Sequence, residues 1–361
     1  MRFEETLAGN YSYVYGGPVA HATIRRDPED FQVEEELGFE PSGSGQHLLL
    51  QIRKRSTNTD YCARRLADYC QVSLRDVGYA GLKDRHAVTS QWFSIDLKGK
   101  TAPDWQLFCE ENIELLHVEA HNRKLKKGAL SGNRFSIILR DISGDNGAIE
   151  QRLQQIASTG VANYFGEQRF GHSNIDMARK MLNNDIVVKN RHKKGIYLST
   201  ARALLFNHVL SNRVSDRSWN QPVNGDVMIL AGRRATFRAD QVDEAITQRL
   251  EAGEIHITGP LCGRGEQLIQ EDAKTIEEPL LAPCTFWVKG LERAGVEHGR
   301  RPLRLSVENL HWQWLESDVL NLHFRLTSGS YATSVLREIV SYQQHHESMQ
   351  RSSEKNNRKN L

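Results

Sequence analysis

The sequence predicts an α+β fold with a mixed, largely antiparallel sheet, interrupted by an inserted, helix-rich α/β domain. Strand-like segments with apolar residues at every second position dominate the first 158 residues and return after residue 305. Helical periodicity dominates between them, and the first part lacks a regular strand–helix–strand alternation. A chain of 361 residues is long enough for two domains. We therefore expect a split domain over 1–158 and 306–342, an insertion over 159–305, and a disordered tail over 343–361.

In the first part, turn and cap residues separate the expected strands. Pro28 favours a turn between two extended segments, and Thr57-Asn58-Thr59 supplies cap residues for a helix over 60–70. Strands are expected over 22–26, 31–37, 47–54, 77–80, 115–121 and 135–142, with a further strand that runs through Trp92 and ends near Leu97, and a helix over 147–158.

After Gly160 the pattern becomes helical, and strand character returns near residue 304. Returning strands would rejoin the first sheet, which is why the middle segment is interpreted as an insertion. The tail is polar and has no periodic apolar face, which predicts disorder. Helices are expected over 176–182, 199–213, 240–250, 270–276 and 330–342, and strands over 304–307, 312–315 and 319–326.

The composition is that of an ordinary globular protein, with 39% hydrophobic and 25% charged residues. No apolar run approaches the length of a membrane span, and no charged-then-apolar leader begins the chain, so we expect a cytoplasmic protein without membrane association. The five cysteines are odd in number and lack C-x-x-C spacing. This favours reduced, buried thiols over a disulfide framework or a zinc site.

The most unusual charge pattern lies in the stretch V-G-Y-A-G-L-K-D-R-H-A-V-T-S-Q-W-F-S, residues 77–94. It places Asp84 between Lys83 and Arg85 on a turn that joins two apolar runs. Loops held by a rigid scaffold often carry function, and nearby positive charge favours an ionised carboxylate. By itself, the pattern is equally compatible with a solvated turn of alternating charges.

Basic residues gather locally although the net charge is only +2. Dense clusters over 121–127 and 189–194 predict a surface for a polyanion. The candidate RNA contacts are Lys83, Arg85, Arg123, Lys124, Lys126 and Lys127.

Several familiar chemistries have no support, because phosphate-loop, dinucleotide-binding, H-E-x-x-H and G-x-S-x-G motifs are absent. What remains is a poised carboxylate, aromatic residues in turns and a basic surface. This set suits an enzyme that acts on a nucleotide taken out of its stack. An ionised aspartate could then serve as nucleophile or base.

The segment G-Y-A-G-L-K-D-R-H-A-V-T-S-Q-W strongly resembles the signature of the TruD family of tRNA pseudouridine synthases. Four further motifs resemble those of the family, and all five stand in the family's order along the chain. The four are D-P-E-D-F-Q-V-E-E near the N-terminus, G-N-R-F at 132–135, N-Y-F-G-E-Q-R-F-G at 163–171 and G-S-Y-A-T-S-V-L-R-E at 329–338. The resemblance covers residues 18–339. It implies a pseudouridine-synthase-like catalytic domain interrupted by an inserted domain, and conversion of uridine to pseudouridine in tRNA, at position 13, without cofactor or metal. No obligate protein partner is evident.

By the same resemblance, Asp84 matches the catalytic aspartate, which forms a covalent adduct with the target uridine. Attack at ribose C1′, attack at uracil C6 and elimination to a glycal all stay open. Arg25 falls where the family has a basic residue that could pair with this aspartate, and Lys83 and Arg85 are competing partners. Phe31 matches an aromatic residue of the uridine pocket, although its pattern also fits a core position in a strand.

Asn133 matches an amide that contacts the substrate nucleotide in the family; the alternative is a turn residue after Gly132. Tyr331 replaces a phenylalanine that stacks on the target base, so its hydroxyl needs a partner or water. Gln168 and Arg169 could be structural links at the domain junction or RNA contacts. Two other functions stay open: the same chemistry on another RNA or position, and a catalytically silent RNA-binding protein on this fold.

Overall fold

The computed structural model describes residues 11–108, 110–171, 173–233 and 235–344. By their internal contacts these residues form two units. The sheet unit comprises Val19–Ala157, Val307–Gly329 and residues 340–344, and the helix-rich unit comprises residues 11–18, Ser158–Ser306 and Ser330–Ile339. Residues 11–18 and 330–339, assigned to the split domain on sequence grounds, therefore group with the middle segment. The naming of the two parts as catalytic and inserted domains stays a prediction.

Within the described residues, the sheet unit contains one ten-stranded sheet with the path β14-β15-β7-β2-β5-β3-β6. Strand β1 pairs with β16 and β7, and β4 pairs with β5. The β2–β5 and β1–β16 pairs are parallel and the others are antiparallel, which confirms the expected mixed, largely antiparallel sheet. The strands are β1 (Ala20–Ile24), β2 (Phe31–Leu37), β3 (His47–Arg55), β4 (Val77–Tyr79), β5 (Val88–Asp96), β6 (Ile113–His121), β7 (Leu130–Gly144), β14 (Glu308–Glu316), β15 (Val319–Thr327) and β16 (Val340–Gln344).

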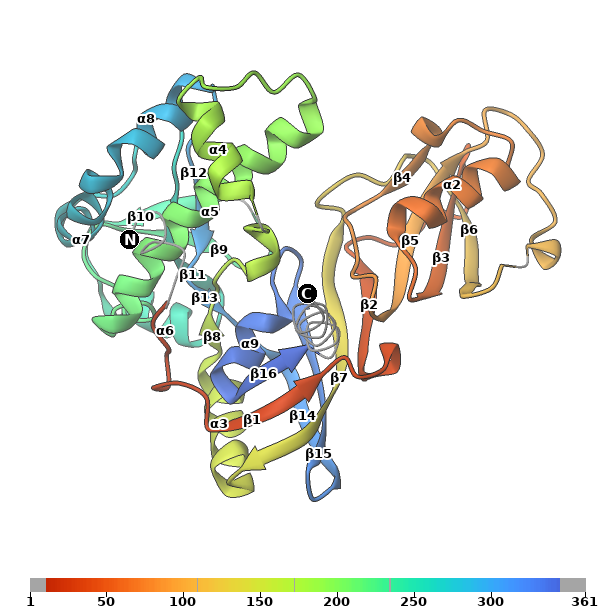
Figure 1. The fold of residues 1–361 in the computed structure, drawn as a ribbon. Helices are drawn as coiled ribbons and strands as arrows, with labels where there is room; N and C mark the ends of the chain where they lie inside the picture. The colour runs from red at the N-terminus through yellow and green to blue at the C-terminus, as the bar shows by residue number, and fades with distance from the viewer. Residues whose placement is uncertain (1–10, 109, 172, 234, 345–361) are drawn as a thin grey trace, which may run out of the picture. The chain divides into compact units, whose positions relative to one another are not determined.

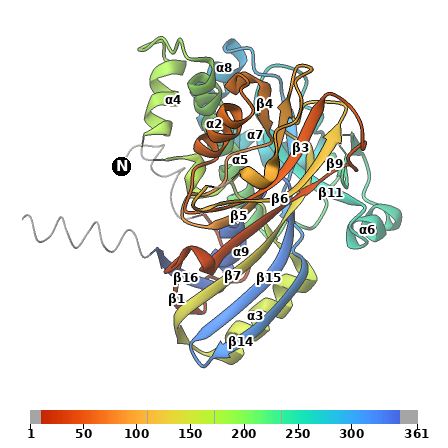
Figure 2. The ribbon, with the colours of Figure 1, turned by 90° about the vertical axis from the view of Figure 1, so that its right-hand side faces the viewer.

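Two helices cover parts of this sheet. Helix α2 (Thr59–Tyr69) lies against β3 and β5, where Leu66 packs with Leu50 and Phe93 (Figure 1). Helix α3 (Asn146–Thr159) lies beside β14 and β15 (Figure 2), and Glu150 Oε1 accepts a hydrogen bond of 2.9 Å from Trp314 Nε1. The short 3-10 helices of this unit are η1 (Pro28–Asp30), η2 (Leu74–Asp76) and η3 (Trp105–Leu107).

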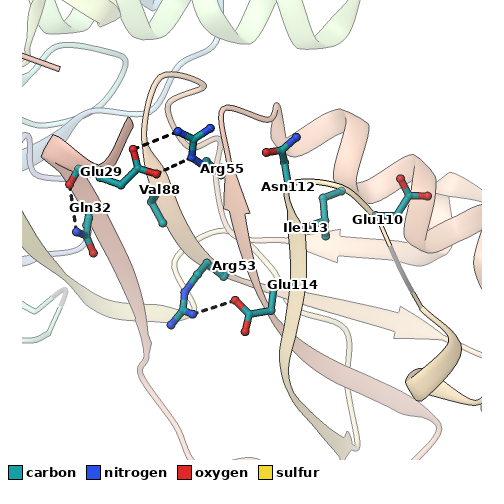
Figure 3. A pocket seen from close by; sticks show the side chains of 9 residues that line it. All are labelled: Glu29, Gln32, Arg53, Arg55, Val88, Glu110, Asn112, Ile113 and Glu114. Carbon is teal, nitrogen blue, oxygen red and sulfur yellow. Dashed lines mark hydrogen bonds and ion pairs between the residues drawn. The ribbon is translucent and has the colours of Figure 1, made fainter. Parts of the chain in front are cut away.

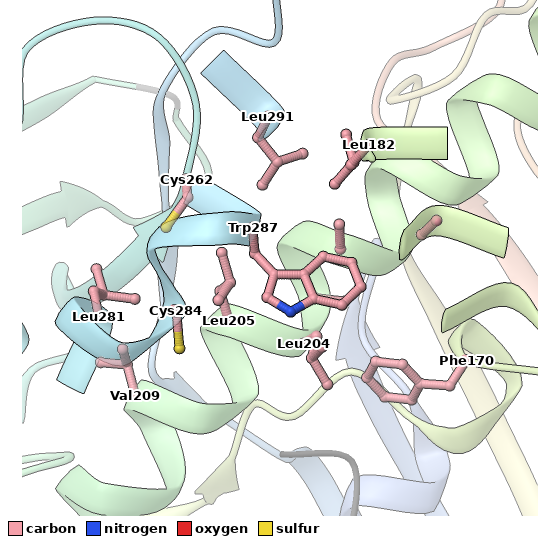
Figure 4. Packing of buried hydrophobic residues seen from close by; sticks show 13 residues of the cluster. Phe170, Leu182, Leu204, Leu205, Val209, Cys262, Leu281, Cys284, Trp287 and Leu291 are labelled. Carbon is pink, nitrogen blue, oxygen red and sulfur yellow. The ribbon is translucent and has the colours of Figure 1, made fainter. Parts of the chain in front are cut away.

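The helix-rich unit is built around α5 (Arg191–Ser215), whose apolar side packs against neighbouring helices. The indole of Trp287 lies at the centre of this cluster (Figure 4). A second, smaller sheet has the order β10-β9-β11-β12, and β13 pairs with β8. The remaining elements are α4 (Asn174–Leu182), α6 (Glu244–Glu251), α7 (Glu271–Leu281), α8 (Thr285–Arg293), α9 (Ala332–Ile339), β8 (Val161–Ala162), β9 (Asp226–Leu230), β10 (Thr236–Ala239), β11 (Ile255–Leu261), β12 (Gly299–Pro302), β13 (Arg304–Leu305), η4 (Glu167–Arg169) and η5 (Ala282–Cys284).

Two sequence predictions were wrong near the C-terminus. The helix expected over 330–342 is α9 and ends at Ile339, because Val340 begins the strand β16 alongside β1. Gln343 and Gln344 belong to this strand rather than to a disordered tail. The rest of the predicted tail lies outside the described residues.

The four described cysteines, Cys62, Cys70, Cys262 and Cys284, are free and buried, as expected; Cys109 lies outside the described residues. Among the helices of the described ranges, none combines the length and the apolar character needed to cross a membrane.

Candidate active site

Asp84 lies on the loop between β4 and β5, and buried polar side chains hold this loop from below. Gln91 Nε2 donates a hydrogen bond of 2.7 Å to the Gly81 carbonyl. The Thr59 hydroxyl accepts from the Lys83 backbone N–H at 3.1 Å and donates to Gln91 Oε1 at 2.9 Å. Because Thr59 and Gln91 are buried, these bonds fix the path of the loop on the sheet.

The carboxylate of Asp84 is paired with Arg25, whose Nη2 lies 2.6 Å from Asp84 Oδ2. Arg25 is buried, has a φ of 56°, and places its guanidinium 4.1 Å from the centre of the Phe31 ring. Its Nη1 donates to Gln344 Oε1 at 3.2 Å. The side chain of Asp84 remains 32% exposed, so the ion pair orients a carboxylate that solvent can reach.

The other two candidate cations are directed elsewhere. Lys83 Nζ lies 3.1 Å from Glu35 Oε1 and also donates to Asn133 Oδ1. Arg85 is exposed and makes no ion pair with a described residue. Of the three cations weighed on sequence grounds, Arg25 is therefore the one paired with Asp84.

Two buried charges beneath the loop were missed on sequence grounds. Glu35 and Lys54 are almost fully buried, and burial raises the pKa of the Glu35 carboxyl and lowers the pKa of Lys54 to about 8. Lys54 Nζ donates to the Thr57 carbonyl at 2.7 Å and to the Asp84 carbonyl at 3.3 Å. Each of these two charged residues occupies an inward-facing position of a strand whose neighbouring inward-facing residues are apolar. A charge at such a position is the sequence signal that could have revealed them.

Phe31 and Asn133 lie on neighbouring strands of the same sheet. Phe31 on β2 is buried and packs edge-on against Phe135 of β7, with ring centres 6.4 Å apart. Asn133 was expected to be a turn residue if not a substrate contact, but it lies within β7, opposite Glu35 of β2. The turn interpretation was wrong because β7 begins at Leu130.

Tyr331 belongs to the helix-rich unit, where its hydroxyl has a partner. Arg169 donates to it from Nη2 at 2.7 Å and from Nε at 3.1 Å. The Tyr331 ring lies edge-on to Phe165, with centres 6.2 Å apart. The Arg301 guanidinium covers Phe165 at 4.2 Å, and burial lowers the pKa of Arg301 to about 10. Gln168 shares the short helix η4 with Arg169 and is exposed.

The basic cluster falls on the loop between β6 and β7. Lys126 and Lys127 are exposed, and the Arg123 guanidinium lies 5.7 Å from the centre of the Phe39 ring. Lys124 is half-buried and donates to the Arg75 carbonyl. The loop thus presents exposed cations to solvent, as a polyanion contact requires.

A pocket of about 490 Å³ opens near the ends of β3, β5 and β6 (Figure 3). Its arginines are already paired, Arg55 with Glu29 at 2.5 Å and Arg53 with Glu114 at 2.9 Å. Gln32 lines it, and side chains of successive strand residues point to opposite faces, so the pocket lies on the other face of β2 from Phe31. Glutamates outnumber arginines in its lining, which makes it a poor site for a phosphate.

Among the described residues, no group of three or more His, Cys, Asp and Glu side chains is arranged to hold a metal ion.

Comparisons with known proteins identify the family. The model of the family described as tRNA pseudouridine synthase D (TruD) matches residues 8–190 and 188–339, so the chain belongs to this family. Proteins named tRNA pseudouridine synthase D are 48% identical over 330 residues in Methylococcus capsulatus and 47% identical over 347 residues in Nitrosococcus oceani. These matches cover 91% and 94% of this chain and 93% and 97% of the relatives.

A third relative of the same name, from Hydrogenovibrio crunogenus, is 42% identical over 332 residues, covering 91% of this chain and 96% of its own. A crystal structure from Methanosarcina mazei, assigned as a tRNA pseudouridine synthase D, superposes with a TM-score of 0.72 at 22% identity. The match covers 94% of this chain and 98% of that chain, and it shows a shared fold. The resemblance stated from the sequence motifs is confirmed.

Proposed function

We propose that this protein isomerises uridine to pseudouridine in tRNA, at position 13, with Asp84 as the nucleophile. Family membership over residues 8–339 supports the reaction class. The observation that carries the residue assignment is the partly exposed Asp84 carboxylate, paired with Arg25 on a loop held by buried hydrogen bonds. A nucleophile needs such a fixed, accessible position next to its substrate.

The reaction rearranges the nucleoside without changing its composition. The bond between N1 of the base and C1′ of the ribose breaks, the uracil turns, and a bond forms between C5 and C1′. C5 loses a proton and N1 gains one, so no electrons are transferred and the balance requires no cofactor. The Asp84 carboxylate would form the covalent adduct, by attack at C1′ or C6, or would act in elimination to a glycal.

Arg25 would keep the carboxylate oriented before the adduct forms, because its guanidinium is itself held by Phe31 and Gln344. The exposed Arg85, with Arg123, Lys124, Lys126 and Lys127, would contribute to holding the polyanionic tRNA. Lys83, also a candidate on sequence grounds, is instead engaged by Glu35 and Asn133. Tyr331 keeps an aromatic face for stacking on the base, with its hydroxyl occupied by Arg169. A tRNA substrate also supports the expected cytoplasmic location.

The test is conversion of unmodified tRNA by the purified protein and by Asp84→Asn. We expect wild type to form pseudouridine at position 13 and Asp84→Asn to bind tRNA without forming it. The matched control is Asp141→Asn, which removes an exposed carboxylate paired with Arg26 at a left-handed backbone position that asparagine tolerates. The control should retain turnover.

Full turnover by Asp84→Asn would refute the nucleophile assignment. Binding of tRNA by wild type without any conversion would favour the silent RNA-binding alternative. Pseudouridine at another position, or in another RNA, would keep the chemistry and correct the substrate.

A further inference from the structure

The side chain of Lys83 joins two strands beside the proposed nucleophile. Glu35 of β2 and Asn133 of β7 are directly opposite each other in the antiparallel register, so their side chains share one face. Lys83 Nζ lies 3.1 Å from Glu35 Oε1 and donates to Asn133 Oδ1. One ammonium group therefore bridges a buried carboxylate and a side-chain amide.

This contact settles which end of the Asn133 amide faces Lys83. A lysine ammonium carries three donors and no acceptor, so the amide atom in contact with it is the oxygen. The amide nitrogen, Nδ2, consequently points away from Lys83. Within the described ranges Nδ2 makes no hydrogen bond, although Asn133 is only 7% exposed. Among the described residues, Nδ2 is not one of the buried polar atoms that lack a partner, so it is open to solvent and to an acceptor on a ligand.

Lys83 itself has little freedom to release the amide. Its backbone N–H is bonded to Thr59, and its carboxylate partner Glu35 is buried and accepts from the Trp92 backbone N–H at 2.8 Å. Rotation of the Asn133 amide by 180° would place two donors against each other in a site of low dielectric. The orientation of the amide is therefore fixed before any substrate binds.

We propose that Lys83 is a positioning residue that presents Asn133 Nδ2 as a hydrogen-bond donor to a carbonyl oxygen of the target uracil. The inference rests on the proposed function, because it assumes that a uracil enters this site. Uracil offers two carbonyl acceptors, O2 and O4. A donor that is fixed in place favours a substrate with an acceptor opposite it, because a substrate without that acceptor leaves the donor unpaired.

The experiment measures kcat/KM with three tRNAs that carry uridine, 2-thiouridine or 4-thiouridine at the target position. Sulfur is a weaker acceptor than oxygen, so the ratio of the uridine value to each thio value reports the hydrogen bond at that carbonyl. In Asn133→Ala, which lacks the donor, the same ratio reports only the effect of sulfur on the chemistry. For one of the two carbonyls, we expect the wild-type ratio to be about fivefold larger than the Asn133→Ala ratio.

Lys83→Met is expected to lower this ratio to the Asn133→Ala value, because the freed amide no longer presents a fixed donor. Adding Lys83→Met to Asn133→Ala should cause no further loss, whereas a purely structural role of Lys83 would give additive losses. The matched control is Lys126→Met, which removes a lysine from the exposed basic loop and should lower all three values by the same factor.

Lys83→Met also leaves Glu35 buried without its partner, so the double variant Lys83→Met with Glu35→Gln is measured beside it. It should give the same reduced ratio with a native far-UV circular dichroism spectrum. Wild-type ratios retained by these variants, or equal ratios for wild type and Asn133→Ala at both carbonyls, would overturn the inference. Failure of wild type to convert the uridine tRNA would instead overturn the proposed function.

Discussion

Replacing Lys54 with methionine tests whether a buried charge supports the Asp84 loop at a cost to the fold. Lys54 Nζ donates to the carbonyls of Asp84 and Thr57, and the whole residue is buried. Methionine has a similar length but carries neither charge nor donor. We expect Lys54→Met to lower turnover, because the loop loses this support, and to remove the cost of burying an ammonium group.

The magnitude follows from the pKa of Lys54, which burial lowers from 10.5 to about 8. Well below pH 8, both folded and unfolded chains hold the proton, and the folded state bears the full cost of about 3 kcal/mol. Between pH 8 and 10.5 the folded state has released the proton while the unfolded state still holds it, so wild type gains stability as the pH rises. From pH 7 to 10 this gain is about 2.5 kcal/mol.

The assay is urea unfolding of wild type and Lys54→Met at a series of pH values. The free energy of unfolding of wild type minus that of the variant should rise by about 2.5 kcal/mol between pH 7 and 10. Loss of the two hydrogen bonds shifts this difference by a constant and leaves its pH dependence unchanged. Lys126→Met, at an exposed position, should show a much flatter difference. A flat difference for Lys54→Met would refute the reasoning.

Two further predictions concern the proposed substrate contacts. Tyr331→Phe keeps the ring but removes the acceptor of the Arg169 donors, so we expect about 1 kcal/mol lower stability in urea unfolding and only a few-fold slower single turnover; a loss as large as that of Tyr331→Ala would mean that the hydroxyl, not the ring, matters. Affinity for tRNA should fall steeply with salt, and replacing both Lys126 and Lys127 with methionine should make the slope of log affinity against log salt shallower by about 1.5. Salt-insensitive binding would contradict the phosphate-contact interpretation.

The strands of the sheet unit were largely predictable, whereas the smaller sheet was missed. Alternating apolar residues in β3 and β15 define an inward face, which is the strongest sequence signal for a strand. In β11, Gly259 and Pro260 lie inside the strand and read as a loop in the sequence. Tertiary pairing with β9 and β12 overrides that local signal, and no local pattern reveals such pairing.

The sequence singles out Asp84 as the candidate nucleophile, but it does not predict the ion pairs around it. Asp84 and Arg25 are 59 residues apart, and their pairing depends on how β1 and the loop are placed by the sheet. Three cations in the sequence were candidate partners of Asp84. Nothing in the sequence distinguishes them, because adjacent residues of a loop point in different directions. The partner of the Tyr331 hydroxyl could not be predicted either, since Arg169 lies 162 residues away in the chain.

On each of three neighbouring strands beneath the Asp84 loop, one inward-facing position carries a polar residue instead of an apolar one. Each of these polar side chains contacts an atom of the loop. Glu35 follows Phe31 and Val33 on the inward face of β2, Lys54 follows Leu50 and Ile52 on β3, and Gln91 precedes Phe93 on β5. An apolar residue at each position would make the sheet more stable, but it would leave the Gly81 and Asp84 carbonyls and the Lys83 ammonium without these partners. Polar residues at inward-facing strand positions depart from the usual apolar pattern, and such departures are expected at functional sites when they all support one loop. The convergence argues that these buried polar residues are retained to fix the loop, and the pH dependence of Lys54→Met measures what that costs the fold.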